Sequence, residues 1–146
     1  VLELAMGSCA GDNHDPDLLF VRERQNGLGD RDMVAKWVRA IEPKLPISGA
    51  LLGMGADMHT ASLFPRGDNL RLALDAHAPI LVPMRAEGLE EQRISLSAHV
   101  LRDAINLHIV IMGEDKKEAL ERARHLPAEE APVRAILDNA TVHWAP

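Results

Sequence analysis

The chain alternates short apolar runs with segments whose apolar residues recur at helical spacing. Segment 32–45 predicts a helix that Pro43 helps to end, with five apolar residues on one face: Met33, Val34, Trp37, Val38 and Ile41. Three apolar runs, 48–55, 78–84 and 106–113, predict buried strands. The first of these enters a glycine turn.

The second half of the chain continues this alternation. Segment 93–105 predicts a strand that turns into a helix with Ser97 as its N-cap. Segment 114–126 begins with acidic residues and continues with basic ones, which suits a helix dipole. The end of the chain predicts a short helix opened by Pro132 and a final strand over 142–144.

Alternating strands and helices predict an α/β fold, Rossmann-like, with a mostly parallel sheet and helices on both faces. A chain of 146 residues with 47% hydrophobic content is long enough to form one hydrophobic core and too short for two ordinary domains. We therefore expect a single domain over residues 1–146. Residues 1–29 are loop-rich and contribute little to a core, whereas residues 30–146 carry the organised pattern.

Charge and cysteine content narrow the classes of function. A formal charge of −6 gives no general attraction to nucleic acid or to an anionic membrane. Cys9 is the only cysteine, which excludes an internal disulfide and a multi-cysteine zinc site and is typical of a reducing compartment. No apolar run reaches membrane-spanning length and no signal peptide is recognisable, so we expect a cytoplasmic protein. Oligomeric state stays open.

Residues that could bind a ligand or act in catalysis lie where the apolar run at 48–55 ends. Gly53 and Gly55 let the backbone approach a ligand, and N–H groups at a following helix start can receive an oxyanion. His59 can act as a general base near neutral pH, and Asp57 can hold its tautomer and orientation. A dinucleotide-binding fingerprint would need a third glycine, and that position is Met58.

Each of these residues also has an ordinary structural interpretation. Asp57 can cap a helix that begins after it, and His59 can be a loop histidine with no catalytic role. Arg24, Arg93 and Lys116 are by default solvated surface charges. Five further histidines show no metal-ligand spacing: His77, His99, His108, His125 and His143.

A resemblance to a known family favours the functional interpretation of these residues over the structural one. The stretch "LLGMGADMHTASLFP" at 51–65 resembles the L-G-M-G-x-D-G-H-T-A-S-L-F-P signature of the 6-phosphogluconolactonases. "RISLS" and "GEDK" are similar to that family's R-I-T-L-T segment and G-x-x-K turn, and the resemblance covers about residues 30–146. The related glucosamine-6-phosphate deaminases follow their G-x-D-G-H core with I-A-F-N-E-P, so "HTASLFP" favours the lactonase.

The resemblance implies hydrolysis of 6-phosphoglucono-1,5-lactone in the pentose phosphate pathway, with no metal or organic cofactor. It implies that His59 takes a proton from the attacking water and that Asp57 orients and supports the imidazole. Arg93 and Lys116 match the family's basic residues near the substrate phosphate. Arg24, in "FVRERQ", resembles part of a D-E-R segment and would be a third phosphate ligand.

Two departures from the family pattern leave alternatives open. Family members are longer, and their N-terminal S-G-G-x-T-P loop and D-S-N segment are not recognisable here, which suggests a fragment or an internally deleted variant. Met58 replaces a glycine: either the turn needs positive φ or close substrate approach, or the family glycine is a packing convenience and Met58 turns outward. The runner-up function is therefore a non-catalytic lactonase-like protein that binds phosphosugar or a protein partner. A metal hydrolase is a distant third.

Overall fold

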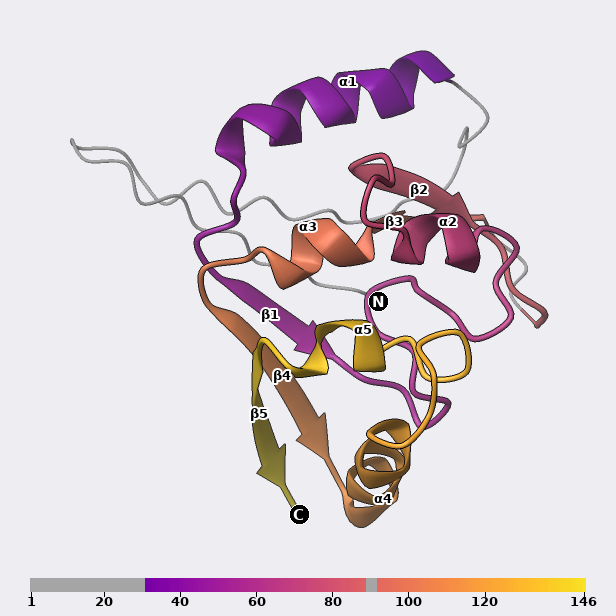
Figure 1. Ribbon diagram of the computed structural model, residues 1–146, viewed down its shortest axis with the longest axis vertical. Helices are drawn as coiled ribbons and strands as arrows, with labels where there is room; N and C mark the ends of the chain where they lie inside the picture. The colour runs from indigo at the N-terminus through magenta and orange to yellow at the C-terminus, as the bar shows by residue number, and fades with distance from the viewer. Residues whose placement is uncertain (1–30, 89–91) are drawn as a thin grey trace.

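The computed structural model describes residues 31–88 and 92–146, which form two β-sheets with helices between and beside their strands (Figure 1). The larger sheet is parallel, has the order β1-β4-β5, and consists of β1 (Ala50–Gly53), β4 (Leu107–Met112) and β5 (Ala140–Ala145). The smaller sheet is an antiparallel pair of β2 (Leu81–Met84) and β3 (Arg93–Leu96).

The helices are α1 (Arg31–Ile41), a 3-10 turn η1 (Glu42–Lys44), α2 (Leu70–Leu74), α3 (Ala98–Arg102), α4 (Glu114–Ala123) and α5 (Arg134–Leu137). Helices and strands largely alternate along the described chain, except that β3 follows β2 and α5 follows α4 directly. None of the helices in the described segments is long and apolar enough to cross a membrane.

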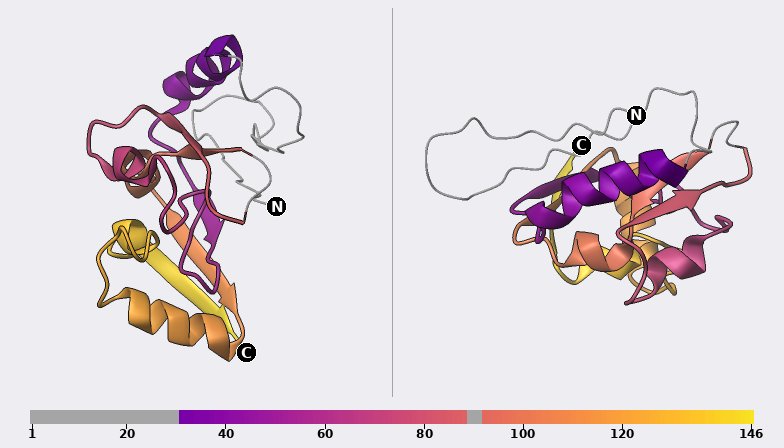
Figure 2. Two further views of the ribbon diagram at one scale, coloured as in Figure 1. Left: turned by 90° about the vertical axis from the view of Figure 1, so that its right-hand side faces the viewer. Right: turned by 90° about the horizontal axis from the view of Figure 1, so that it is seen from above.

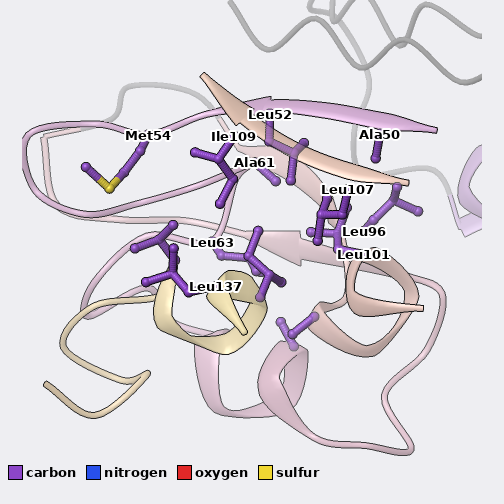
Figure 3. Close-up of a cluster of buried hydrophobic side chains, with 14 of the residues drawn as sticks. Ala50, Leu52, Met54, Ala61, Leu63, Leu96, Leu101, Leu107, Ile109 and Leu137 are labelled. Atoms are coloured by element: carbon purple, nitrogen blue, oxygen red, sulfur yellow. The ribbon is translucent and has the colours of Figure 1, made fainter. Parts of the chain in front are cut away.

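One face of the parallel sheet forms the core. Leu52 of β1 pairs in register with Ile109 of β4, and both side chains are almost completely buried. They join one apolar cluster with Leu101 of α3, Leu120 of α4 and Ile136 of α5. Figure 3 shows Leu52 and Ile109 directed from the sheet into this cluster. Period-two alternation along β4 thus buries Leu107, Ile109 and Ile111 on the core face of the sheet.

The opposite face of the parallel sheet is open in the described part of the chain. Leu51, Val110 and Met112 are 48%, 41% and 68% exposed. In the left view of Figure 2, the orange α4 and the yellow α5 lie together on one side of the strands. The mostly parallel sheet with helices is confirmed, whereas the second face, where we also expected helices, exposes these three side chains.

Most predicted elements are present, with shifted bounds. Val34, Trp37 and Val38 pack against the core from α1, and the 3-10 turn containing Pro43 follows that helix. Ser97 stands at the N-cap of α3, but its buried hydroxyl makes no capping hydrogen bond. The final strand is longer than predicted, the five-residue α2 was not predicted, and β2 and β3 form an antiparallel pair apart from the parallel sheet.

Candidate active site

A tight turn follows the carboxyl end of β1 and carries the candidate acid and base. Met54 and Thr60 form an isolated antiparallel bridge across the base of this turn. Within it, the Gly55 N–H donates to the His59 carbonyl at 3.0 Å, and the Met58 N–H donates to the Gly55 carbonyl at 2.9 Å. The buried Thr60 hydroxyl donates to the carbonyl of Gly53, the last residue of β1, at 2.9 Å. These bonds fix residues 55–59 against the end of the strand.

Asp57 and His59 form a hydrogen-bonded pair on this turn. His59 Nδ1 lies 2.5 Å from Asp57 Oδ1, and the same oxygen accepts the His59 backbone N–H at 3.2 Å. An ionised carboxylate can only accept, so with Asp57 ionised the Nδ1–H donates, and a neutral ring then keeps the lone pair on Nε2. The His59 side chain is 34% exposed, and its ring centroid lies 4.8 Å from that of Phe64. This arrangement has the form of a general base held by an acid.

Gly55 permits this pair, whereas Gly53 does not touch it. A Cβ added at Gly55 would lie closer than 3.0 Å to His59 Nδ1 and Asp57 Oδ1, while one at Gly53 would meet nothing within 4 Å. The Gly55 N–H is already used by the His59 carbonyl, so it does not receive an oxyanion in this conformation. Gly55 therefore makes room for the acid and base, a use that its place in the sequence did not reveal.

Met58 is held in a left-handed conformation. Its φ is 67°, a region that residues with a Cβ adopt at a cost. Its side chain is half-buried and packs against the core, so the alternative in which Met58 turns outward is wrong. The Met58 carbonyl accepts the Val133 N–H at 3.1 Å, which ties the turn to the segment that leads into α5. Ala61 and Arg66, which follow this turn in the sequence, also have positive φ (51° and 61°), so the backbone strain continues beyond Met58.

The helix expected after the glycine turn is absent. Residues 58 and 59 have no regular structure, and the next helix in the described chain is α2, which begins at Leu70. The alternative in which Asp57 caps a helix is therefore wrong. Its carboxylate instead serves the His59 ring and backbone.

A buried serine also supports the turn, and sequence reasoning had not singled it out. Ser95 Oγ on β3 accepts the Ser62 N–H at 3.2 Å and donates to the Leu96 carbonyl at 2.9 Å. Ser95 is 1% exposed. It lies in the "RISLS" segment, which was noted only for its arginine. A small hydroxyl residue in a buried strand next to a functional motif is the signal that could have found it.

The candidate phosphate ligands lie on two elements near this turn. Arg93 is the first residue of β3; it is half-buried, and its Nε atom is buried. Lys116 is in the first turn of α4, which begins directly after the carboxyl end of β4. In Figure 1 and in the left view of Figure 2, the loop that follows β1 lies beside α4. Arg24 and Cys9 lie outside the described residues.

Within residues 31–88 and 92–146, no cluster of three or more histidine, cysteine or acidic side chains could hold a metal ion. His77 is almost fully exposed beside Asp75, and His99 Nε2 lies 2.9 Å from the Ala78 carbonyl. His108 and His143 lie next to each other on the open face of the parallel sheet.

Comparison with known proteins identifies the family. Residues 25–144 match the model of the glucosamine-6-phosphate isomerases/6-phosphogluconolactonase family. A 6-phosphogluconolactonase of Rhizobium meliloti is 42% identical over 107 residues, which are 69% of this chain and 46% of that protein. A 6-phosphogluconolactonase of Pseudomonas aeruginosa is 41% identical over 108 residues, which are 72% of this chain and 45% of that protein.

A solved structure agrees with these relatives. The crystal structure of a 6-phosphogluconolactonase from Shewanella baltica superposes with a TM-score of 0.72 at 25% identity, over 82% of this chain and 54% of that one. The chain spans about half the length of the curated relatives it matches. By its sequence and its fold, the chain belongs to the glucosamine-6-phosphate isomerase/6-phosphogluconolactonase family.

Proposed function

We propose that this chain carries the catalytic acid and base of a hydrolase that opens 6-phosphoglucono-1,5-lactone, in the pentose phosphate pathway. The observation that carries the proposal is the 2.5 Å contact between His59 Nδ1 and Asp57 Oδ1, which leaves Nε2 available on a partly exposed ring. Relatives named 6-phosphogluconolactonase, at 41–42% identity, support this reaction over that of the deaminases. A cytoplasmic location is part of the proposal, supported by the single cysteine.

In the proposed mechanism, His59 Nε2 takes a proton from a water molecule as its oxygen attacks the lactone carbonyl. The tetrahedral intermediate then collapses, the bond from the carbonyl carbon to the ring oxygen breaks, and that oxygen receives the proton from His59. Asp57 keeps Nδ1 protonated and stabilises the imidazolium that forms between the two steps. One water is consumed, and a carboxylic acid and a hydroxyl group result. No step of this proposed mechanism passes through a metal or an organic cofactor.

Arg93 and Lys116 are the proposed ligands of the substrate phosphate. Arg93 and Ser95 are two residues apart on β3 and therefore point to the same side of the strand, and Ser95 contacts Ser62, three residues after His59. Lys116 is supported by topology: β1 and β4 are parallel neighbours, so the His59 turn and the start of α4 both follow carboxyl ends at one edge of the sheet. Both arguments support positions for Arg93 and Lys116 near the His59 turn, as a phosphate site for this substrate requires.

A second candidate function is a non-catalytic member of the family that binds phosphosugar or a protein partner. The observation that favours it is Met58, which has a φ of 67° at a position where the family signature has glycine. Hydrolysis above the spontaneous rate favours the enzyme. Binding of 6-phosphogluconate without such hydrolysis favours the second candidate.

The experiment that tests the substrate class compares two neighbouring lysines. Lys116→Gln should raise KM for 6-phosphogluconolactone by about ten- to a hundredfold, because a charge-assisted hydrogen bond contributes about 1.5–3 kcal/mol. Lys117→Gln removes the same charge one residue away, from a side chain that pairs with Glu114 and stacks on Trp144, and should leave KM unchanged. Glucono-1,5-lactone without phosphate should not distinguish the variants. Equal KM values for the phosphorylated lactone in both variants would remove Lys116 from the site.

A further inference from the structure

Two histidines from neighbouring parallel strands meet on the open face of the larger sheet. His108 Nδ1 of β4 lies 3.0 Å from His143 Nε2 of β5, and the ring centroids are 5.1 Å apart. Thr141 is in register with His108, and Val110 is in register with His143, so the two rings meet diagonally across the strand pair. His143 is exposed and His108 is half-buried. Both rings are therefore held by the backbone of a paired sheet and are accessible to small ions.

The separation of these nitrogens matches the bite of a metal chelate. Two imidazole nitrogens bound to one ion at about 2.05 Å are about 2.9 Å apart at a right angle and about 3.3 Å apart at the tetrahedral angle. The observed 3.0 Å is close to the right-angle value. Ions with right-angle coordination that prefer imidazole are Ni²⁺ and Cu²⁺. A small ring rotation that directs both lone pairs to one ion would complete the geometry.

We propose that His108 and His143 form a bidentate site for a divalent late transition metal such as Ni²⁺, with water at the remaining coordination positions. For both nitrogens to bind the ion, the ring that donates the hydrogen bond between them changes tautomer, and its proton moves to its other ring nitrogen. The site is separate from the proposed active site: both histidines lie on the outward face of β4 and β5, whereas Asp57 and His59 lie on the turn beyond the carboxyl end of β1. The proposal therefore stands independently of the lactonase activity.

Nickel(II) titration of the purified protein by calorimetry tests the site. Nickel is chosen because it does not oxidise a thiol and binds imidazole at right angles. His108→Ala and His143→Ala should each lower the affinity by about a hundredfold, the usual gain of a second linked contact. The double variant should bind no more weakly than either single variant, because lone histidines elsewhere in the chain remain. His77→Ala is the matched control: the His77 side chain is 96% exposed, and its Nδ1 lies near Asp75.

A melting-temperature measurement supplies a second readout. Nickel should raise the melting temperature of the wild type and of His77→Ala, and it should raise those of the two single variants much less, because only the chelate binds the folded state strongly. Undiminished affinity after either replacement, or an equal loss in His77→Ala, would overturn the proposal. His108 and His143 would then be two hydrogen-bonded imidazoles only.

Discussion

Met58 offers the sharpest test of the strained turn. At φ 67°, a residue with a Cβ is about 1–2 kcal/mol less stable than in the right-handed region, whereas glycine adopts this conformation freely. Glycine also makes the unfolded chain more flexible, which costs about 0.4–1 kcal/mol of stability. The φ angle alone therefore predicts a gain of roughly 0.5–1 kcal/mol for Met58→Gly.

Packing of Met58 changes this expectation. Its side chain is half-buried against the core, and complete burial of a methionine contributes about 1.5–3 kcal/mol, so removing it costs about 1 kcal/mol. Met58→Gly should therefore leave the free energy of unfolding nearly unchanged. Met58→Ala is the matched variant, because it loses the same side chain and keeps the Cβ. The glycine variant should be more stable than the alanine variant by roughly 0.5–1 kcal/mol, or about 2–3 °C in melting temperature.

Calorimetry or urea unfolding of the two variants measures this difference directly. At a negative φ the order reverses, and alanine is the more stable by about 0.4–1 kcal/mol. An alanine variant equal to or more stable than the glycine variant would thus refute the left-handed conformation of Met58 and the strain argument with it. If the Met58 side chain also obstructs the lactone, both variants should raise turnover.

Three further replacements test how the turn is built. Gly55→Ala should separate Asp57 from His59 and remove hydrolysis while changing stability little, because flexible side-chain ends move aside; Gly53→Ala, where a Cβ meets nothing within 4 Å, is the control. Leu63→Ala, at a completely buried site, should lower the free energy of unfolding by about 2–5 kcal/mol, against less than about 0.5 kcal/mol for Leu72→Ala, whose side chain is 46% exposed. Thr60→Val should cost about 1–2 kcal/mol in denaturant unfolding, because the Gly53 carbonyl loses its donor.

The sequence predicted those features that depend on neighbours along the chain. The apolar spacing of α1 and the runs of β1 and β4 were sufficient to place those elements, and two residues of separation were enough to pair Asp57 with His59. The left-handed Met58 was only one of two alternatives, because its conformation is set by packing and by the distant Val133 N–H. Short pieces such as α2 were missed since five residues carry no periodic signal.

The contact of Ser95 with Ser62 shows the same limit. These residues are 33 positions apart, and nothing near either one indicates the partner. The antiparallel pairing of β2 with β3 is likewise a tertiary result, because their apolar runs suit a parallel or an antiparallel neighbour equally. Local chemistry was therefore visible in the sequence, whereas the supports that hold it in place required the fold.

Hydrolysis of 6-phosphogluconolactone by the wild type, His59→Ala and His77→Ala, each corrected for spontaneous opening of the lactone, tests the central claim most directly. His59 Nδ1 contacts Asp57 at 2.5 Å on the turn, whereas His77 lies near Asp75 on an exposed segment at 3.6 Å, so the control also carries a neighbouring acid. The account predicts that His59→Ala loses about a hundredfold or more of the enzymatic rate and that His77→Ala keeps it. A His59→Ala protein that turns over the lactone as fast as the wild type would contradict the assignment of the catalytic base.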